Sequence, residues 1–355
     1  LSDVPRSTSY AVVDDSIEQA YVDRVGRLAR GDERDLRVAY TPLHGVGGAV
    51  LAAAFAAAGF PQPITVPEQA APDPDFPTVS FPNPEEPGAL DLVRALARKR
   101  RTDLVIANDP DADRCAVAVG DLLLTGDELG VLIADHLMRT GNGSGPSTGH
   151  FATTIVSSSM LGTMCAARGV PYAETLTGFK WIVRAGADLA YGYEEAIGYC
   201  VAPSLVRDKD GISTAVVIAD LAATLKSRGR TLLDRLGELQ REFGVHATGQ
   251  LAIRVEDVAE IDATMRRLRA GPPASLAGRA VTCADLLPQT DGLRFTGDAV
   301  RVVVRPSGTE PKLKCYLQVV VPAGRDLDEA RHQAAGRLAT LHSDMAASLG
   351  QTPAP

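Results

Sequence analysis

The alternation of short apolar runs with helical segments most constrains how this chain can fold. Between residues 36 and 107, the strand-like runs LRVAY and TDLVIAN are separated by an Ala-rich helix that begins at Ala49 and by a helix predicted over Gly88–Arg100. Strands that alternate with helices are typical of a largely parallel sheet with helices on both faces. The proline-rich stretch from Pro61 to Pro87 predicts a loop without regular structure.

A second unit of the same kind is expected to begin near Thr125. Helical periodicity follows in GDELGVLIADHLMR, and a flexible connection, GNGSGPSTGH, leads to the strand-like FATTIVSS. A further helix, the segment PYAETL and a helix over Asp210–Ser227 complete this unit, which ends near Gly237. The two successive units are candidate structural relatives.

Clustered strands distinguish the last part of the chain. LRFTG, AVRVVVRPSG and LKCYLQVVV follow one another closely, and a helix is predicted over Leu327–Leu349. The predicted fold class is therefore α/β, with two consecutive mixed-sheet α/β domains followed by a small α+β C-terminal domain. The expected divisions are a linker or domain remnant over 1–15, α/β domains over 16–122 and 123–237, and the C-terminal domain with its linker over 238–355.

Composition and charge exclude several classes of function. The net charge of −8 argues against broad binding to the phosphate backbone of nucleic acid, although it allows a small basic pocket for an anionic metabolite. The five cysteines are odd in number and contain no CxxC pair, which indicates a reducing compartment and predicts a cytoplasmic protein. Because no apolar run is long enough to span a bilayer, we expect no membrane partner.

The stretch IANDPDADRCAV places three carboxylates at alternate positions between two apolar runs. Hard cations such as Mg²⁺ prefer oxygen ligands, so Asp109, Asp111 and Asp113 are candidate ligands of one ion. An EF-hand loop is excluded, because it needs Gly at its sixth position and Glu at its twelfth, where this chain has Arg114 and Gly120. The alternative is a polar turn that joins two strands.

The stretch RPSGTEPK offers the donors that a phosphate group requires. Arg305 provides a bidentate guanidinium, Ser307 and Thr309 provide hydroxyls, Gly308 frees the backbone, and Lys312 adds a positive charge. A charged hairpin tip would have the same composition, so both interpretations stay open.

Other polar loops are weaker candidates. In GYEEAIGY, Glu194 and Glu195 could accept hydrogen bonds from sugar hydroxyls or form a solvated loop end. Lys180 and Lys209 could each bind an anion or be surface charges. TPLHGVGG matches no established phosphate loop, so we interpret its glycines as turn residues and give His44 little weight as a site residue.

Taken together and in this order, these loops resemble those of the α-D-phosphohexomutase family, which includes phosphoglucomutases and phosphomannomutases. The resemblance covers nearly the whole chain. DPDADR is similar to the magnesium loop of the family, GYEEAIGY to its sugar-binding loop and RPSGTEPKLK to its phosphate-binding loop. It implies an intramolecular phosphotransferase of carbohydrate metabolism that interconverts sugar 1-phosphates and 6-phosphates.

The resemblance implies a role for each matching residue. Asp109, Asp111 and Asp113 would bind Mg²⁺, while Arg114 and Lys209 would be the catalytic basic groups near the reacting phosphate. The residues that would bind the phosphosugar substrate are Lys180, Glu194, Glu195, Arg305, Ser307, Gly308, Thr309 and Lys312.

The sequence departs from the family pattern in two places. The sugar loop of the family commonly reads Gly-Glu-x-Ser, whereas here the position after the two glutamates is Ala196. The form GYEEAIGY is more similar to the branch of phosphoglucomutases and phosphopentomutases that also includes some bacterial proteins called phosphomannomutases. The catalytic serine of the family precedes a histidine in an N-terminal domain, and no Ser-His dipeptide occurs here. Ser7, Ser9 and the run Ser157–Ser159 lack the surrounding pattern. We therefore expect domains two to four without the phosphoserine domain, an upstream segment, and little activity of the chain as given.

Two other classes of function compete with a mutase. A non-catalytic sugar-phosphate-binding protein would use the same loops without turnover. A magnesium phosphatase would need Thr or Val at the position of Asp113, and no alternative nucleophile is evident.

Overall fold

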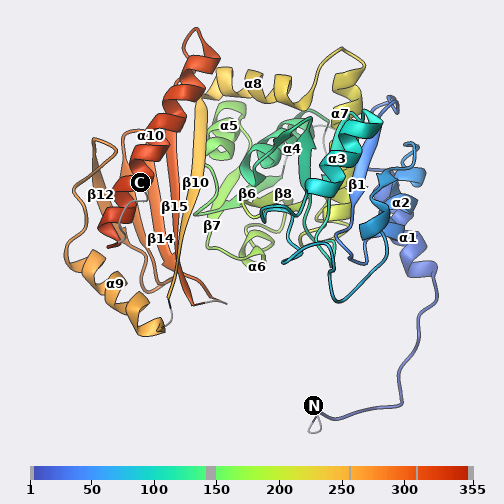
Figure 1. The fold of residues 1–355 in the computed structure, drawn as a ribbon, viewed down its shortest axis with the longest axis horizontal. Coiled ribbons are helices and arrows are strands. Elements are labelled where there is room, and N and C mark those ends of the chain that lie inside the picture. Colours follow the sequence, from blue (N-terminus) through green and yellow to red (C-terminus); the bar gives the residue numbers. More distant parts are fainter. Residues whose placement is uncertain (1–3, 141–148, 256, 309–310, 351–355) are drawn as a thin grey trace.

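The computed structural model describes residues 4–140, 149–255, 257–308 and 311–350, and it contains three consecutive units (Figure 1). Each unit is built around its own sheet. In Figure 1 the first unit, the second unit and the C-terminal unit lie side by side from right to left. Among the described helices, none combines the length and the apolar composition needed to cross a membrane.

The first unit is a five-stranded mixed sheet in the order β2-β1-β3-β4-β5. β1 is parallel to β2 and β3, whereas β3–β4 and β4–β5 are antiparallel. The strands are β1 (Val38–Thr41), β2 (Ile64–Thr65), β3 (Leu104–Ala107), β4 (Ala116–Val119) and β5 (Leu122–Leu123), and the helices are α1 (Ser16–Gly26), α2 (Gly48–Ala57) and α3 (Asp91–Arg100). The loop between β3 and β4 holds the three aspartates.

The second unit repeats this arrangement with a four-stranded sheet in the order β7-β6-β8-β9. Again the central strand, β6, has a parallel neighbour on each side, and the hairpin β8–β9 is antiparallel. The strands are β6 (His150–Thr154), β7 (Tyr172–Thr175), β8 (Leu189–Glu194) and β9 (Gly198–Cys200), and the helices are α4 (Gly126–Thr140), α5 (Met160–Arg168), α6 (Phe179–Ile182), α7 (Gly211–Lys226) and α8 (Leu232–Phe243). The corresponding strand orders support the structural relationship between the two units.

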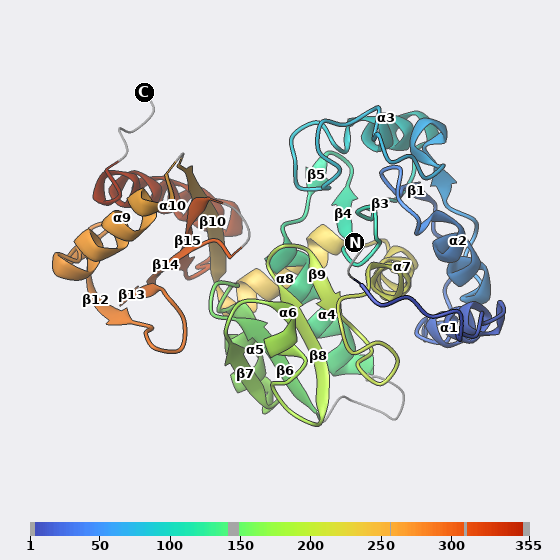
Figure 2. The same cartoon turned by 90° about the horizontal axis from the view of Figure 1, so that it is seen from below.

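The C-terminal unit is an antiparallel sheet in the order β10-β15-β14-β13-β12-β11. The long helix α10 packs against β10 and β15, as Figure 2 shows from below. The strands are β10 (Val245–Arg254), β11 (Ser275–Leu276), β12 (Arg279–Asp285), β13 (Leu293–Gly297), β14 (Val300–Pro306) and β15 (Lys312–Val321), and the helices are α9 (Val258–Ala270) and α10 (Leu327–Ser348). The α/β class with an α+β end is thus confirmed.

Several details differ from the sequence-based expectation. The proline-rich stretch contains the short strand β2 and a single 3₁₀ turn, η1 (Pro67–Gln69), so it is not wholly irregular. The first helix ends at Gly26 and not at Arg30, and α3 begins at Asp91 and not at Gly88. The predicted division at 237 falls inside α8, which continues to Phe243 because its capping box at Thr231 starts an uninterrupted amphipathic helix.

The two α/β units share one continuous hydrophobic core. Buried side chains of the first unit, such as Leu51 and Phe55 of α2, belong to the same cluster as Ile218 of α7. The helix α7 also bonds to the first unit, because the Tyr21 hydroxyl donates to Asp210 at the start of α7 (2.8 Å). The aspartate loop and the second unit are therefore held in one packed body.

Candidate active site

The aspartate loop brings its three carboxylates together. A ligand oxygen of each of Asp109, Asp111 and Asp113 lies within 4.8 Å of the others. Ala112 lies between them in the left-handed backbone region (φ +58°), and its N–H donates to the backbone oxygen of Asp109 (2.9 Å). This tight turn directs alternate side chains to one point.

The electrostatics of this loop suit a hard cation. Burial raises the pKa of Asp109 to about 6, with a further contribution from the charges of Asp113 and Asp111, although the N–H of Arg114 opposes this change (3.0 Å to Oδ1). A divalent ion would relieve the repulsion among the three carboxylates. Three oxygen donors on one turn are the chemistry that Mg²⁺ takes, so the residues present fit this ion.

The TPLHGVGG loop supports the aspartate loop from behind. A Cβ atom on Gly45 would lie 2.4 Å from the backbone of Pro110, so glycine is needed there for close approach. The left-handed positions of this turn are Leu43 (φ +48°) and His44 (φ +60°), and Gly45 closes the turn, because its N–H donates to the backbone oxygen of Pro42 (2.8 Å). His44 is buried and bonds through Nε2 to the Thr78 hydroxyl (2.9 Å), in agreement with its small weight as a site residue.

Lys209 connects the aspartate loop to the glutamates of GYEEAIGY. Its Nζ lies 3.0 Å from Asp113 Oδ2 and 4.0 Å from Glu194 Oε1. Burial lowers the pKa of Lys209, but the hydrogen bond to Asp113 and the charge of Glu194 outweigh this and raise it. Burial, together with the charge of Glu195, raises the pKa of Glu194 to about 7. Lys209 therefore remains a cation between two carboxylates.

Glu195 points into a different set of donors. Its Oε2 accepts hydrogen bonds from the hydroxyls of Ser157 (3.0 Å) and Thr154 (3.3 Å). Thr154 is the last residue of β6, and Ser157 lies in the loop that follows. Both donors come from the edge of the sheet at which the parallel strands end. Glu194 and Glu195, although adjacent in sequence, thus have separate neighbours.

Basic residues gather at one end of the C-terminal sheet. Arg254 on β10 is directly opposite Lys312 on β15, and Lys314 is directly opposite Arg305 on β14. Like charges directly opposite one another repel, and a bound anion is attracted to such a concentration of positive charge. The Nε of Arg305 is buried and has no hydrogen-bond partner among the described residues. This end of the sheet is therefore suited to a phosphate group.

A cavity of about 780 Å³ unites the three units, because Arg114, Glu195 and Lys312 line the same space. These residues come from the first, the second and the C-terminal unit, respectively. A space of this size accommodates a phosphorylated sugar. Further lining residues that the sequence did not single out include Asn83, Asp127, Thr248, Gln250, Arg254, Lys314 and Tyr316.

Some predicted residues lie elsewhere. Lys180 is exposed on α6 and stacks on Trp181, with 5.7 Å between its Nζ and the ring centroid, and it does not line the cavity. Ser307 donates its N–H to the backbone oxygen of Lys312 (2.8 Å), and Gly308 is exposed. Thr309 lies outside the described residues.

Asp127 is the most notable site residue that sequence reasoning missed. It is buried in the first turn of α4, and burial raises its pKa to about 6. Its Oδ1 accepts hydrogen bonds from Ser158 N–H (2.7 Å) and from the Tyr193 hydroxyl (3.1 Å). An aspartate at the start of a helix is usually a cap for that helix. The local sequence therefore does not indicate that the Asp127 carboxylate is buried and binds Ser158 and Tyr193.

Comparison with known proteins agrees with this geometry. The matching family models are phosphoglucomutase/phosphomannomutase alpha/beta/alpha domain II over residues 19–122, alpha/beta/alpha domain III over 125–243 and the C-terminal domain over 251–331. A protein from Haemophilus influenzae named "Probable phosphomannomutase" is 43% identical over 340 residues, covering 92% of this chain and 69% of that protein. The chain belongs to the phosphoglucomutase/phosphomannomutase family. A first-domain model is not among the matches, as the resemblance led us to expect.

More distant members of the phosphoglucomutase/phosphomannomutase family include human proteins. Human phosphopentomutase and human glucose 1,6-bisphosphate synthase are each 34% identical, and they cover 82% and 80% of this chain. The chain spans only about half the length of these two relatives, 54% and 52%.

Solved structures of the family share the fold. The open form of parafusin, a phosphoglucomutase from Paramecium, matches with a TM-score of 0.67 at 21% identity, covering 95% of this chain and 62% of that chain. N-acetylphosphoglucosamine mutase from Aspergillus fumigatus, solved with GlcNAc-6P and magnesium, matches with a TM-score of 0.53 at 16% identity, covering 90% and 65%.

Proposed function

We propose that this chain is the substrate-binding and metal-binding part of a magnesium-dependent phosphohexomutase. The reaction interconverts a sugar 1-phosphate and a sugar 6-phosphate through a bisphosphate intermediate. The single observation that supports this most is the cavity lined jointly by Arg114, Glu195 and Lys312. Around this one cavity lie the Arg114 guanidinium next to the three aspartates, the Glu195 carboxylate, which would accept hydrogen bonds from sugar hydroxyls, and the Lys312 ammonium, which would bind phosphate.

The two ends of the substrate would meet different chemistry. The non-reacting phosphate would bind among Arg305, Lys312, Ser307 and their neighbours, where the Arg305 guanidinium offers a bidentate fork. Glu194 and Glu195 would accept hydrogen bonds from the sugar hydroxyls in the middle. Such contacts hold the phosphoryl group in line for transfer, and positioning of this kind supplies much of the rate.

Arg114 and Lys209 would act at the reacting phosphate. Arg114 lies 3.5 Å from Asp109 through its Nε, and Lys209 is held between Asp113 and Glu194. Lys209 is therefore held before substrate binds and Arg114 already lies beside the acidic loop, so less reorganisation is needed when charge develops on the phosphoryl oxygens. Magnesium held by Asp109, Asp111 and Asp113 would neutralise part of this charge.

The transferred phosphoryl group would come from a phosphoserine that the residues of this chain do not supply. The run Ser157–Ser159 is committed to hydrogen bonds within the protein, and no serine of the chain precedes a histidine. We therefore propose that this chain binds phosphosugars and that turnover requires the serine domain. The non-catalytic binding protein remains the second candidate, because it predicts the same binding.

Isothermal titration calorimetry tests this proposal. We expect glucose 1,6-bisphosphate to bind the chain in the presence of MgCl₂, and glucose, which lacks phosphate, to bind far more weakly. Equal binding of both compounds, or none of either, would contradict a phosphosugar site. Addition of a separately produced serine domain from a family member should restore turnover if the chain is part of a mutase and should leave a binding protein inactive.

A pentose phosphate is the alternative substrate. The identity of 34% to human phosphopentomutase and the GYEEAIGY form of the sugar loop both favour it. Parallel titrations with ribose 1-phosphate and glucose 1-phosphate would separate the two, because the tighter ligand identifies the sugar that the loop accepts.

A further inference from the structure

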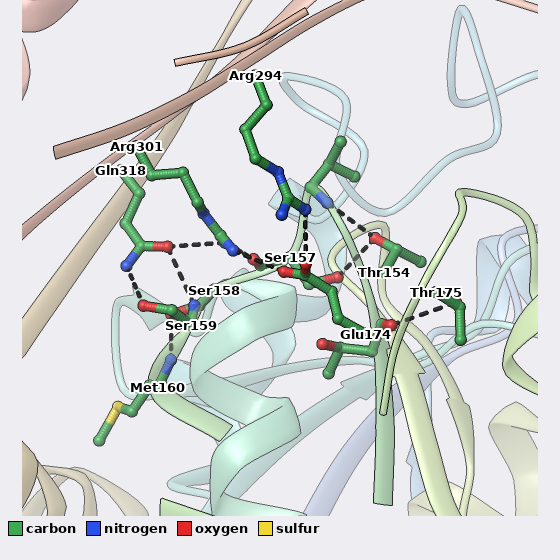
Figure 3. A network of polar contacts seen from close by, with 12 residues as sticks. Thr154, Ser157, Ser158, Ser159, Met160, Glu174, Thr175, Arg294, Arg301 and Gln318 are labelled. Carbon is green, nitrogen blue, oxygen red and sulfur yellow. Dashed lines mark hydrogen bonds and ion pairs between the residues drawn. The ribbon is translucent and has the colours of Figure 1, made fainter. Parts of the chain in front are cut away.

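The serine run Ser157–Ser159 lies where the second unit meets the C-terminal unit (Figure 3). The three residues follow β6, and each is held by a different part of the protein. Ser158 N–H donates to Asp127 of α4 (2.7 Å), and Ser159 N–H donates to Gln318 of β15 (3.0 Å). The run is thus fixed from both units at once.

Ser157 has contacts in two directions. Its hydroxyl donates to Glu195 Oε2 (3.0 Å), the carboxylate that lines the cavity. Its backbone oxygen accepts a hydrogen bond from the Arg301 guanidinium of β14. One residue therefore lies between the sugar-loop glutamate and a side chain of the C-terminal unit.

Arg301 is well held in this position. Its side chain is only 16% exposed, and it also donates to Gln318 Oε1 (2.9 Å) and Glu174 Oε1 (2.9 Å). Arg301 and Arg305 are four residues apart on β14, and side chains separated by an even number of residues lie on the same face of a strand. The strand that presents the phosphate-binding arginine thus also presents Arg301.

We propose that Ser157 is a positioning residue for Glu195, and that Arg301 sets Ser157 from the C-terminal unit. The inference rests on the proposed function, because it makes phosphate capture near Arg305 and sugar recognition by Glu195 energetically coupled. Arg301 holds the Ser157 backbone before any ligand binds, and the Ser157 hydroxyl keeps Glu195 oriented toward the sugar of a substrate whose phosphate lies at the end of β14. A hydrogen bond to a charged group contributes enough that its loss lowers affinity by about tenfold or more.

The same interface offers a matched control in Arg294. Its guanidinium donates to Glu174 Oε2 (2.5 Å), so it also joins the C-terminal unit to β7. In contrast to Arg301, no contact of Arg294 with the serine run is among those described. Replacement of Arg294 therefore weakens the interface without removing the connection to Glu195.

Calorimetric titrations of the full chain test the coupling with two probes, glucose 1,6-bisphosphate and inorganic phosphate. For Ser157→Ala and for Arg301→Gln we expect the affinity for the bisphosphate to fall by about tenfold. The affinity of Ser157→Ala for inorganic phosphate should stay unchanged, because phosphate alone does not use Glu195. The double variant should lose little more than either single variant, because both changes interrupt one connection. Arg294→Gln should stay within about twofold of the original protein.

Ser157→Thr distinguishes positioning from a merely structural role. Threonine keeps the hydroxyl donor, so bisphosphate affinity should recover toward the original value. Three results would overturn the inference if the unchanged chain still binds the bisphosphate. They are additive losses of affinity in the double variant, a loss of affinity in Arg294→Gln equal to that in Arg301→Gln, and no recovery of affinity in Ser157→Thr. Absence of bisphosphate binding by the unchanged chain would instead overturn the proposed function, and the inference with it.

Discussion

A Cβ atom on Gly126 would lie 1.9 Å from the backbone oxygen of Glu195, so the first residue of α4 touches the GYEEAIGY loop directly. No side chain can occupy that space without moving one of the two backbones. The next residue, Asp127, bonds to the serine run that holds the Glu195 carboxylate through Ser157. The start of α4 thus positions both the backbone and the side chain of Glu195.

Gly126→Ala should therefore lower both stability and ligand binding. An overpacked position costs about 1–3 kcal/mol of unfolding free energy, and here the displaced group is the sugar loop. Gly336→Ala is the control, because a Cβ atom there meets nothing within 4 Å and alanine is favoured inside the helix α10. Denaturant unfolding should show a loss for the first variant and no loss for the second. Equal stability of the two variants would contradict the close approach at Gly126.

The metal assignment predicts that Asp111→Asn weakens Mg²⁺ binding, because one ligand charge is removed from the cluster. Asp111 is exposed, so the substitution should leave the fold intact. Asp121→Asn removes another exposed carboxylate, which pairs with Arg98 outside the loop, and this variant should bind Mg²⁺ as the original chain does. Titration of both variants with MgCl₂ provides the measurement, and identical affinities would exclude the loop as the metal site.

The phosphate assignment predicts that Arg305→Lys weakens phosphosugar binding by about 1–3 kcal/mol, since an ammonium group cannot reproduce the bidentate fork of a guanidinium. Arg279→Lys on β12 of the same sheet is the control, because its guanidinium is exposed and pairs only loosely with Asp298 (3.6 Å). Calorimetry with glucose 1,6-bisphosphate should separate the two variants. If both bind alike, the phosphate is bound elsewhere.

The contiguous parts of the site could be predicted from the sequence, whereas the assembled parts could not. Asp109, Asp111 and Asp113 are neighbours on one turn, so their spacing makes them candidate ligands of one ion, and the resemblance of the other loops to a known family favoured this over a plain polar turn. The contact of Lys209 with Asp113 depends on how α7 packs on the first unit. The local sequence pattern does not predict this packing. For Lys180 the sequence suggested a site residue that the structure does not place at the cavity. Its charge made it a candidate for anion binding, but the side chain stacks on Trp181 and does not line the cavity.

The same limit applies to the fold. Strand β14 could be predicted because Val302, Val303 and Val304 form a continuous apolar run. In the structure all three are buried. Strand β10 was not predicted, because VHATGQLAIR contains no strong apolar run. In agreement with this composition, most of its residues are only half-buried. Its partner β15 lies more than 50 residues further along the chain, and only the tertiary ladder stabilises it as a strand.

The buried carboxylate of Asp127 predicts an unusual pH dependence of stability. Burial raises its pKa to about 6 in the folded protein, against 3.8 for the ordinary carboxyl. Between these values the folded state binds more protons than the unfolded state, so the contribution of Asp127 to stability falls as the pH rises from 4 to 6. The difference corresponds to about 3 kcal/mol for one proton over this range.

Asp127→Asn removes this titration, because the amide stays neutral at every pH. From pH 4 to pH 7, the unfolding free energy of the original chain should decline by about 3 kcal/mol relative to that of Asp127→Asn. Asp121→Asn, which replaces an exposed carboxylate outside this cluster, is the control for removing one surface aspartate. Urea unfolding at pH 4, 5, 6 and 7 measures all three proteins. Parallel curves for the original chain and Asp127→Asn would mean that Asp127 keeps an ordinary pKa and that the hydrogen bonds from Ser158 and Tyr193 fully offset its burial.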